Sequence, residues 1–380
     1  MIKQYYKQAL AQLRQHPLIS IIGIVGTALS IFLIMLVVMM QQVKVAPFSP
    51  ESNRNRFLHV HYMSISHKDW GNGTSNGPMS VQTAREVYKS LKTPEAVTVY
   101  CCMTVSTPVS LPGAPAIGAD VRETDDTFFH VFDFQFTDGK PYDEATFTAG
   151  RPVAVITESI SRALFGSIQS VGKEFLLSHA PYRVVGVVKD VSTLADMAYG
   201  QVWIPFTSTN LSNDTWSDNH MGMMSVTLLA HDREDFDEIR AEAKRRMNEY
   251  NSILADQGYT LIDRNRPYDQ ETQSISFAAN LEPDLKAARR ERVIIFIILL
   301  LVPAINLSSM TQSRLRQRVA EIGVRRAFGS TRIEMVGQIV MENLVITLLA
   351  GAIGLLISIL FAYWGTDILF AQPYSVTLNA

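Results

Sequence analysis

The chain has 380 residues, a formal net charge of −2 and an apolar fraction of 47%. This length allows two or more folded units, and the nearly balanced charge argues against a protein dedicated to nucleic-acid binding. The apolar residues are clustered, so these averages hide three strongly hydrophobic runs.

The segment before the first hydrophobic run, residues 1–17, is predicted to be an amphipathic helix on the cytoplasmic membrane surface. Ile2, Tyr5 and Leu13 recur at helical spacing, and all charged residues of this segment are basic. An apolar face beside basic side chains is typical of a helix that lies in the membrane surface.

Three apolar runs are predicted to cross the bilayer. Residues 18–40 and 293–310 hold no charged side chain, and 339–364 hold only Glu342. A helix rises about 1.5 Å per residue, so about 20 apolar residues cross the roughly 30 Å hydrocarbon core. The first run is too long for a signal peptide and is expected to remain as an anchor. The predicted α-helical transmembrane bundle has spans at 18–40, 292–310 and 336–364.

The polar, mixed residues 41–291 predict one large α+β domain outside the membrane. Ser80 is the expected N-cap of its first helix, and Gly166 is expected to end its second. Helices are predicted at 80–92, 158–166, 233–254 and 266–291, and strands at 57–65, 152–156, 182–191, 201–206 and 223–230. Residues 97–111 are β-rich, and Pro108 indicates an edge or a strand end there.

Two patterns resemble catalytic or phosphate-binding motifs but lack their context. Ser75 lies in a G-x-S-x-G match at 73–77, yet loop residues precede it where a nucleophile elbow needs a strand. The glycines of 166–174 are one residue too far apart for a phosphate-binding loop, and Glu174 replaces the required hydroxyl. No catalytic residue is predicted, so the chain is not expected to be an enzyme.

Two further patterns concern metals and redox chemistry. His59 and His61 share one face of a predicted strand, but no helical histidine pair or C-x-x-C supports a metal site. Cys101 and Cys102 are adjacent, and we expect a reduced or buried pair within a strand rather than a disulfide. We therefore predict no metal and no cofactor bound by this chain.

Charge predicts the orientation in the membrane. Loop 311–335 carries six arginines and two glutamates, and residues 1–17 carry only basic charges, so both are expected in the cytoplasm. Residues 41–291 and 365–380 then lie outside. The basic residues Lys286, Arg289, Arg290 and Arg292 favour the opposite orientation, but the rule weakens beside long translocated domains.

The arginine-rich loop 311–335 encodes a short helix, a turn and a new helix start. Glu321 lies three residues after Arg318 and four before Arg325, which is ion-pair spacing on a helix. Gly329 is a natural helix end, and Thr331 with Glu334 forms a capping box. The charge alone would fit an anchor on lipid headgroups, whereas the ordered helix favours docking into a partner protein.

The spans carry small residues at regular spacing. Gly26 and Ser30 lie four apart in the first span, and Ala350, Gly354 and Ser358 form a longer ridge in the third. Such ridges let helices approach closely, within one chain or between two copies. Asn306 in the second span indicates a polar contact between helices.

Residues 306–358, above all the run R-V-A-E-I-G-V-R-R-A-F-G, closely resemble the permease signature of the MacB/FtsX-like ABC transporter family. Residues 151–191 resemble the periplasmic core domain of that family. The resemblance covers essentially the whole chain and implies a type VII permease without an ATPase domain of its own. The resemblance implies four spans, of which three are expected within these 380 residues.

The resemblance implies partners and a site. A cytoplasmic ABC ATPase subunit would bind ATP and Mg²⁺, and a second permease subunit would complete a homo- or heterodimer in the bacterial inner membrane. A periplasmic adaptor or an outer-membrane channel is left open. The coupling element would comprise Arg318, Glu321, Ile322, Gly323, Arg325, Arg326, Ala327, Gly329, Thr331 and Glu334.

The expected function is to couple ATP hydrolysis by the ATPase to a periplasmic conformational change, for export, efflux or mechanotransmission. The main alternative is a membrane-anchored periplasmic ligand sensor without transport activity. A sensor would need a cytoplasmic output domain, and this chain offers only the arginine-rich loop.

Overall fold

The computed structural model describes residues 17–362. The predicted surface helix at 1–17, apart from Pro17, and the predicted segment 365–380 lie outside the described residues. The chain divides into two compact units, a helical unit (residues 17–42 and 286–362) and an α/β unit, Val43–Leu285. Each unit is described by itself.

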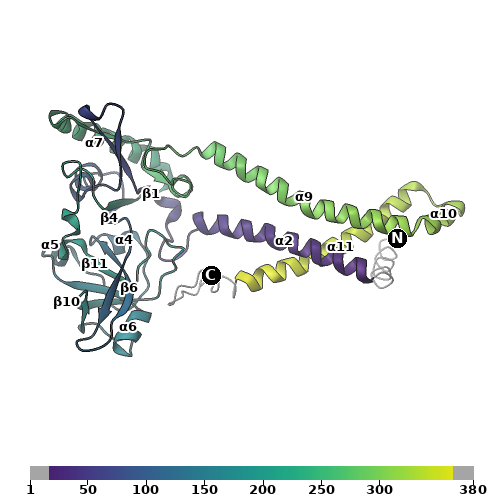
Figure 1. Ribbon diagram of the computed structural model, residues 1–380, viewed down its shortest axis with the longest axis horizontal. Helices are drawn as coiled ribbons and strands as arrows, with labels where there is room; N and C mark the ends of the chain where they lie inside the picture. Colours follow the sequence, from purple (N-terminus) through teal and green to yellow (C-terminus); the bar gives the residue numbers. More distant parts are fainter. Residues whose placement is uncertain (1–16, 363–380) are drawn as a thin grey trace. The chain divides into compact units, whose positions relative to one another are not determined.

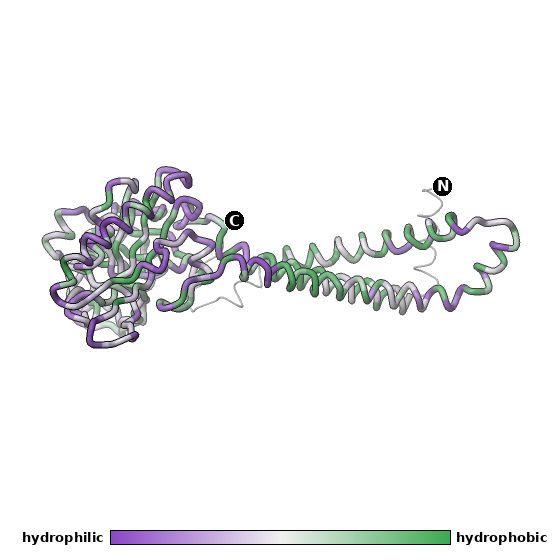
Figure 2. The backbone as a smooth tube through the Cα atoms, turned by 90° about the horizontal axis from the view of Figure 1, so that it is seen from above, coloured by the Kyte–Doolittle hydropathy of each residue, from purple (hydrophilic) through white to green (hydrophobic). Residues whose placement is uncertain are grey.

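The helical unit contains three long apolar helices and one short helix (Figure 1). Within the described residues, three stretches are long and apolar enough to cross a membrane, Ile21–Val45, Leu285–Gln317 and Arg332–Leu360. Figure 2 shows these helices as predominantly hydrophobic, with hydrophilic residues gathered near the turn that follows the second. The three predicted apolar helices are confirmed. The helices are α2 (Pro17–Val45), α9 (Leu285–Gln317), α10 (Val319–Ala327) and α11 (Arg332–Leu360).

Helix α2 packs closely against α9 because it presents glycines there. A Cβ at Gly23 would lie 1.8 Å from Sδ of Met310, so any larger residue there would require the Met310 side chain to move. A Cβ at Gly26 would lie 3.6 Å from Nδ2 of Asn306, an ordinary contact. Gly26 also accepts a 2.8 Å hydrogen bond from Ser30 Oγ through its carbonyl. Gly23, which was not predicted as a packing residue, is thus the tighter contact.

The ridge on α11 faces α2. Ala350, Gly354 and Ser358 are buried, and a Cβ at Gly354 would lie 2.7 Å from the carbonyl oxygen of Ala28. Ser358 Oγ satisfies its own donor by a 2.8 Å bond to the Gly354 carbonyl, so a polar side chain costs little in this apolar contact.

The α/β unit is built on one large sheet and a smaller one (Figure 1). Along the large sheet the strand order is β11-β8-β10-β9-β5-β6-β4-β12-β1-β14, and β11 also pairs with β6. Six strands, from β11 to β6, therefore close into a ring. The strands are β1 (Phe57–Val60), β2 (Met63–His67), β3 (Thr74–Gly77), β4 (Ala96–Cys101), β5 (Val105–Ser110), β6 (Ile117–Thr124), β7 (Phe136–Gly139), β8 (Val153–Thr157), β9 (Glu174–Leu177), β10 (Ala180–Val188), β11 (Val202–Pro205), β12 (Met224–Leu229), β13 (Tyr259–Ile262) and β14 (Tyr268–Asp269).

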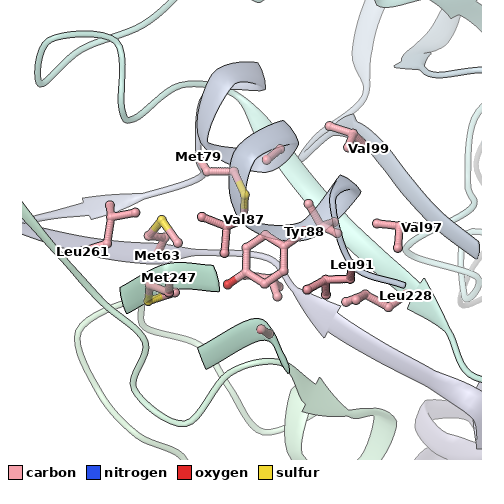
Figure 3. Packing of buried hydrophobic residues seen from close by; sticks show 14 of the residues in the cluster. Met63, Met79, Val87, Tyr88, Leu91, Val97, Val99, Leu228, Met247 and Leu261 are labelled. Carbon is pink, nitrogen blue, oxygen red and sulfur yellow. The ribbon is translucent and has the colours of Figure 1, made fainter. Parts of the chain in front are cut away.

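Short helices and one long helix cover the sheets. They are α3 (Val81–Ala84), α4 (Phe128–Val131), α5 (Glu144–Thr148), α6 (Glu158–Phe165), α7 (Phe236–Leu254) and α8 (Gln270–Gln273), with a π-helical turn, η3 (Arg85–Lys89), after α3. Figure 3 shows one apolar core, in which Tyr88 from η3 lies among Met63, Val97, Leu228 and Met247. A second core fills the six-strand ring and includes Ile156, Phe175 and Val184.

Local signals in the α/β unit are confirmed, and two boundaries are corrected. Ser80 caps α3, and Gly166 ends α6 with φ +70°. The predicted strand 57–65 is two strands in different sheets. The predicted helix at 266–291 is confirmed from residue 285 on, where α9 begins, and is wrong before it, where β14, α8 and an irregular segment lie. Pro267 and Pro283 each disfavour helix in the residue before them.

A buried ion pair lies near the start of the α/β unit. Arg54 Nε donates a 2.7 Å bond to Glu51, and both side chains are almost fully buried. Glu51 also accepts bonds from the backbone amides of Met197 (2.9 Å) and Ala198 (3.0 Å), and Arg54 donates to the Ala46 carbonyl (3.0 Å). Burial raises the pKa of Glu51 although Arg54 opposes this shift. The pair ties residues 46–54 to residues 197–198.

Candidate coupling element

The turn between α10 and α11 forms where the sequence places its breaking and starting signals. Gly329 has φ +95°, a left-handed conformation that suits glycine. The Ser330 amide then bonds the Arg325 carbonyl at 3.1 Å and closes the end of α10. Thr331 Oγ1 accepts from the Glu334 amide (3.3 Å), and Glu334 accepts from the Thr331 amide (3.0 Å). This reciprocal capping box starts α11.

Five side chains join α10 to α11 in a closed cycle, which we call the polar ring: Arg318, Glu321, Arg325, Gln338 and Glu342. Arg318 contacts Glu321 at 2.9 Å and Glu342 at 3.1 Å. Arg325 contacts Glu321 at 2.6 Å and Gln338 at 2.8 Å. Gln338 donates a 2.9 Å bond to Glu342 and closes the ring.

The polar ring balances its charges and becomes more buried toward α11. Two arginines face two glutamates, so the ring has no formal net charge. The Glu342 side chain is only 7% exposed, whereas that of Glu321 is 43% exposed. The hydrogen bond from Arg318 lowers the pKa of Glu321, and the charges of Arg318 and Arg325 add to this effect. Glu321 therefore stays ionised near neutral pH.

The structure separates the predicted coupling residues into an inner and an outer group. Arg318, Glu321 and Arg325 bond within the polar ring, and Ile322 lines a small hollow beside them with Met335. Gly323, Arg326 and Ala327 are exposed. Ile322 is half-buried because it lies on the side of α10 that borders this hollow.

Two apolar side chains beside the exposed residues Gly323, Arg326 and Ala327 are themselves exposed. Phe328 is 88% exposed and Ile333 is 85% exposed, on either side of the Gly329 turn. A Cβ at Gly323 would meet nothing within 4 Å, so the surface of α10 is open at this point. An open helical surface with an exposed aromatic ring and an exposed cation is chemically suited to contact another protein.

Sequence reasoning missed Gln338 and Glu342 as site residues; both lie in the first two turns of the third predicted span. One signal could have found them: Glu342 is the only charged residue between 339 and 364. An acid within a spanning helix is costly and is normally paired. Its nearest sequence partners at helical spacing include Gln338, four residues earlier.

The patterns rejected from the sequence have structural roles. His59 is buried, and its ring nitrogens bond Thr227 (3.1 Å) and Gln270 (2.9 Å). Burial lowers the pKa of His59 to about 3. Ser75 lies in β3 and accepts a 3.1 Å bond from Trp216. Within residues 17–362, no group of three or more His, Cys, Asp or Glu side chains could hold a metal ion.

The two cysteines are free thiols. Cys101 is buried at the end of β4, and Cys102 is half-buried. A side-chain hydrogen bond to Cys102 lowers the pKa of Cys101. The expectation of a reduced or buried pair within a strand holds for Cys101, whereas Cys102 lies just beyond the end of β4.

Three apolar helices, a mixed α/β unit and a capped helical turn between two of the long helices define a membrane protein that carries one large α/β domain. Comparison with known proteins agrees. Residues 18–246 match the family described as MacB-like periplasmic core domain, and residues 293–379 match the FtsX-like permease C-terminal family. The chain belongs to the MacB/FtsX-like family of ABC transporter permeases.

Curated relatives are distant and longer. The uncharacterized ABC transporter permease YknZ of Bacillus subtilis is 22% identical over 244 residues, which cover 62% of this chain and 55% of YknZ. The macrolide export ATP-binding/permease protein MacB of Escherichia coli K12 is 22% identical over 252 residues, covering 65% of this chain and 36% of MacB. The chain thus spans about half or less of the length of these relatives.

Two solved structures resemble part of the chain. The periplasmic region of MacB from Actinobacillus actinomycetemcomitans has 19% identity and a TM-score of 0.37, covering 53% of this chain and 88% of its own. The extracellular domain of YknZ from Gram-positive bacteria has 14% identity and a TM-score of 0.38, covering 53% and 99%. The family assignment rests on the sequence matches.

Proposed function

We propose that this chain is the transmembrane permease subunit of an ABC transporter. In this proposal a separate cytoplasmic ATPase binds ATP and Mg²⁺, and its conformational cycle moves the α/β domain on the other side of the membrane. The movement serves export, efflux or mechanotransmission. The observation that carries the proposal is α10, which directs its polar ring toward α11 and leaves Arg326 and Phe328 exposed.

The proposal includes an orientation and partners. Loop 311–335 would be cytoplasmic and residues 41–291 periplasmic, in a bacterial inner membrane, because arginines concentrate in this loop. A second permease subunit, identical or different, would complete the assembly. The apolar side chains exposed along the described part of α9, for example Ile294 and Ile298, suit lipid or another span.

The proposal can be tested by reversing one exposed charge. In cells that express the full chain, Arg326→Glu should weaken association with the ABC ATPase by about tenfold, which corresponds to about 1.4 kcal/mol. Phe328→Ala should weaken it by removing an exposed ring. Both variants should still insert in the membrane, because neither side chain takes part in the polar ring.

The matched control is Arg316→Glu, an exposed arginine near the end of α9 but outside α10. It should leave the association unchanged. A photo-crosslinking amino acid at position 328 identifies the partner directly, and the product must contain an ABC ATPase. Equal recovery of the ATPase with wild type and both α10 variants would contradict docking at this surface.

A further inference from the structure

Helix α10 is connected to its two neighbours in different ways. On the α9 side, only Arg318 leaves the helical conformation, with φ −111° and ψ 12°. On the α11 side, the polar ring adds side-chain bonds across the turn. Among the described residues, the side-chain hydrogen bonds of α10 run within its own helix or to α11. The chain thus bends at one residue between α9 and α10, whereas the bonds of the polar ring hold α10 to α11. We call these bonds from the polar ring to α11 the brace.

The brace holds α10 at both of its ends. Arg318, the N-cap of α10, contacts Glu342, and Arg325 in its last turn contacts Gln338. Gln338 and Glu342 are four residues apart and therefore share one face of α11. Two attachment points fix the orientation of a short helix as well as its distance, because a helix held at one point can still rotate about it.

Glu342 is the residue on which the brace depends most. It accepts bonds from both Arg318 and Gln338, and it is buried in the spanning helix α11. An acid is expensive in such a position unless it is paired. Removing it opens the ring at its most buried corner and takes away the only α11 partner of Arg318 within the ring.

We propose that α10 and α11 move as one rigid body that hinges at Arg318, and that Glu342 is the positioning residue that carries a displacement of α10 into the third span. The source of the displacement rests on the proposed function, namely the ATPase partner. The brace itself requires no partner, so the two ideas can fail separately.

The rigidity is tested on the full chain in lipid nanodiscs without nucleotide. Genetically encoded spin labels replace Gly323 on α10 and Val340 on α11, two positions that are exposed. Wild type should give one narrow distance distribution. Glu342→Ala should lose this single peak, and Glu342→Asp should restore much of it. A distribution as narrow in Glu342→Ala as in wild type would overturn the proposal.

Two further variants keep the rigidity test interpretable. Arg325→Gln breaks the same ring at its half-exposed corner, so it serves if Glu342→Ala does not insert. Asn343→Val is the matched control: Asn343 neighbours Glu342, but its 2.9 Å bond runs to Thr311 on α9. The control should keep the narrow distribution. Broadening in Asn343→Val equal to that in Glu342→Ala would refute a specific brace.

The transmission is tested with the ATPase bound. ATP should change the distance between labels at Gly323 and Ser313 on α9, while the distance between Gly323 and Val340 stays constant. Glu342→Ala should retain ATPase association but lose the ATP-dependent change at the far part of α11, read between Leu356 and Ile294. If ATP instead changed the distance between Gly323 and Val340 in wild type and left the distance between Gly323 and Ser313 constant, the proposed hinge at Arg318 would be overturned. Failure of any ATPase to associate would refute the proposed function and leave the nanodisc result standing.

Discussion

Replacing Gly354 by alanine tests how closely α2 and α11 pack. The new Cβ would lie 2.7 Å from the carbonyl oxygen of Ala28 and 3.1 Å from Cβ of Ile31. Carbon and carbonyl oxygen normally approach to about 3.3–3.6 Å, so the helices must separate by about 0.6–0.9 Å. The obstructing atom belongs to the backbone and cannot rotate away.

The cost of this separation follows from the packing that it loosens. A radial gap of about 0.5–1 Å forfeits a quarter to a half of a dispersion contact, and Ala350 and Ser358 on the same ridge are buried. Overpacking of a close contact costs about 1–3 kcal/mol. Alanine in a helix regains up to about 1 kcal/mol over glycine. We therefore compare Gly354→Ala with a second glycine on α11.

Gly351→Ala is the matched control, because its Cβ would lie 3.8 Å from the end of the Ile31 side chain, an ordinary contact. Both variants gain the same helix propensity, so their difference isolates the steric cost. In detergent-solubilised full chain, Gly354→Ala should lower the free energy of unfolding by about 1–3 kcal/mol relative to Gly351→Ala. Equal stabilities would refute the close approach of α2 and α11.

Two further predictions concern the α/β unit. In a urea titration, Arg54→Met should lower the free energy of unfolding by about 3–5 kcal/mol, because Glu51 would stay buried without its cation. The control is Arg56→Met, whose partner Glu95 is partly exposed. It should lower the free energy of unfolding by less than about 1 kcal/mol. His59 has a pKa of about 3 in the folded state and about 6.5 in the unfolded state. As the pH is lowered, the unfolded state therefore binds the proton first. The free energy of unfolding should fall by up to about 1.4 kcal/mol for each unit that the pH is lowered between about 6.5 and about 3. His59→Gln should reduce the slope of stability against pH, whereas replacing the exposed His179 should leave it unchanged; an unaltered slope in His59→Gln would contradict a buried neutral imidazole.

Signals carried by near neighbours in the chain are recognisable in the amino-acid sequence alone. Ser80 and Thr83, or Thr331 and Glu334, are three residues apart, so both partners of each cap are visible in one turn of sequence. Long apolar runs identify spanning helices because the bilayer sets a fixed length. The α10 helix and its Gly329 end were predictable for the same reason.

Contacts between distant residues carry no such local signal. Nothing local to β11 indicates that it pairs with β6, about 80 residues earlier by the spacing of their register, and residues 57–65 alternate evenly although they enter two sheets. Gly23 meets Met310 and Gly26 meets Asn306, both on α9, and the sequence around these glycines does not show which contact is closer.

The coupling element also has features set by near neighbours in the chain and features set by distant contacts. Local signals are enough to predict a helix, a glycine turn and a second helix start in residues 318–334, because each signal acts within about one helical turn. The side of that helix that faces α11 is set by contacts between residues far apart in the chain. Arg318 meets Glu342 across 24 residues and Arg325 meets Gln338 across 13. The fold brings these distant residues into contact. As a result, Glu321 and Arg325 bond within the polar ring, whereas Arg326 remains exposed.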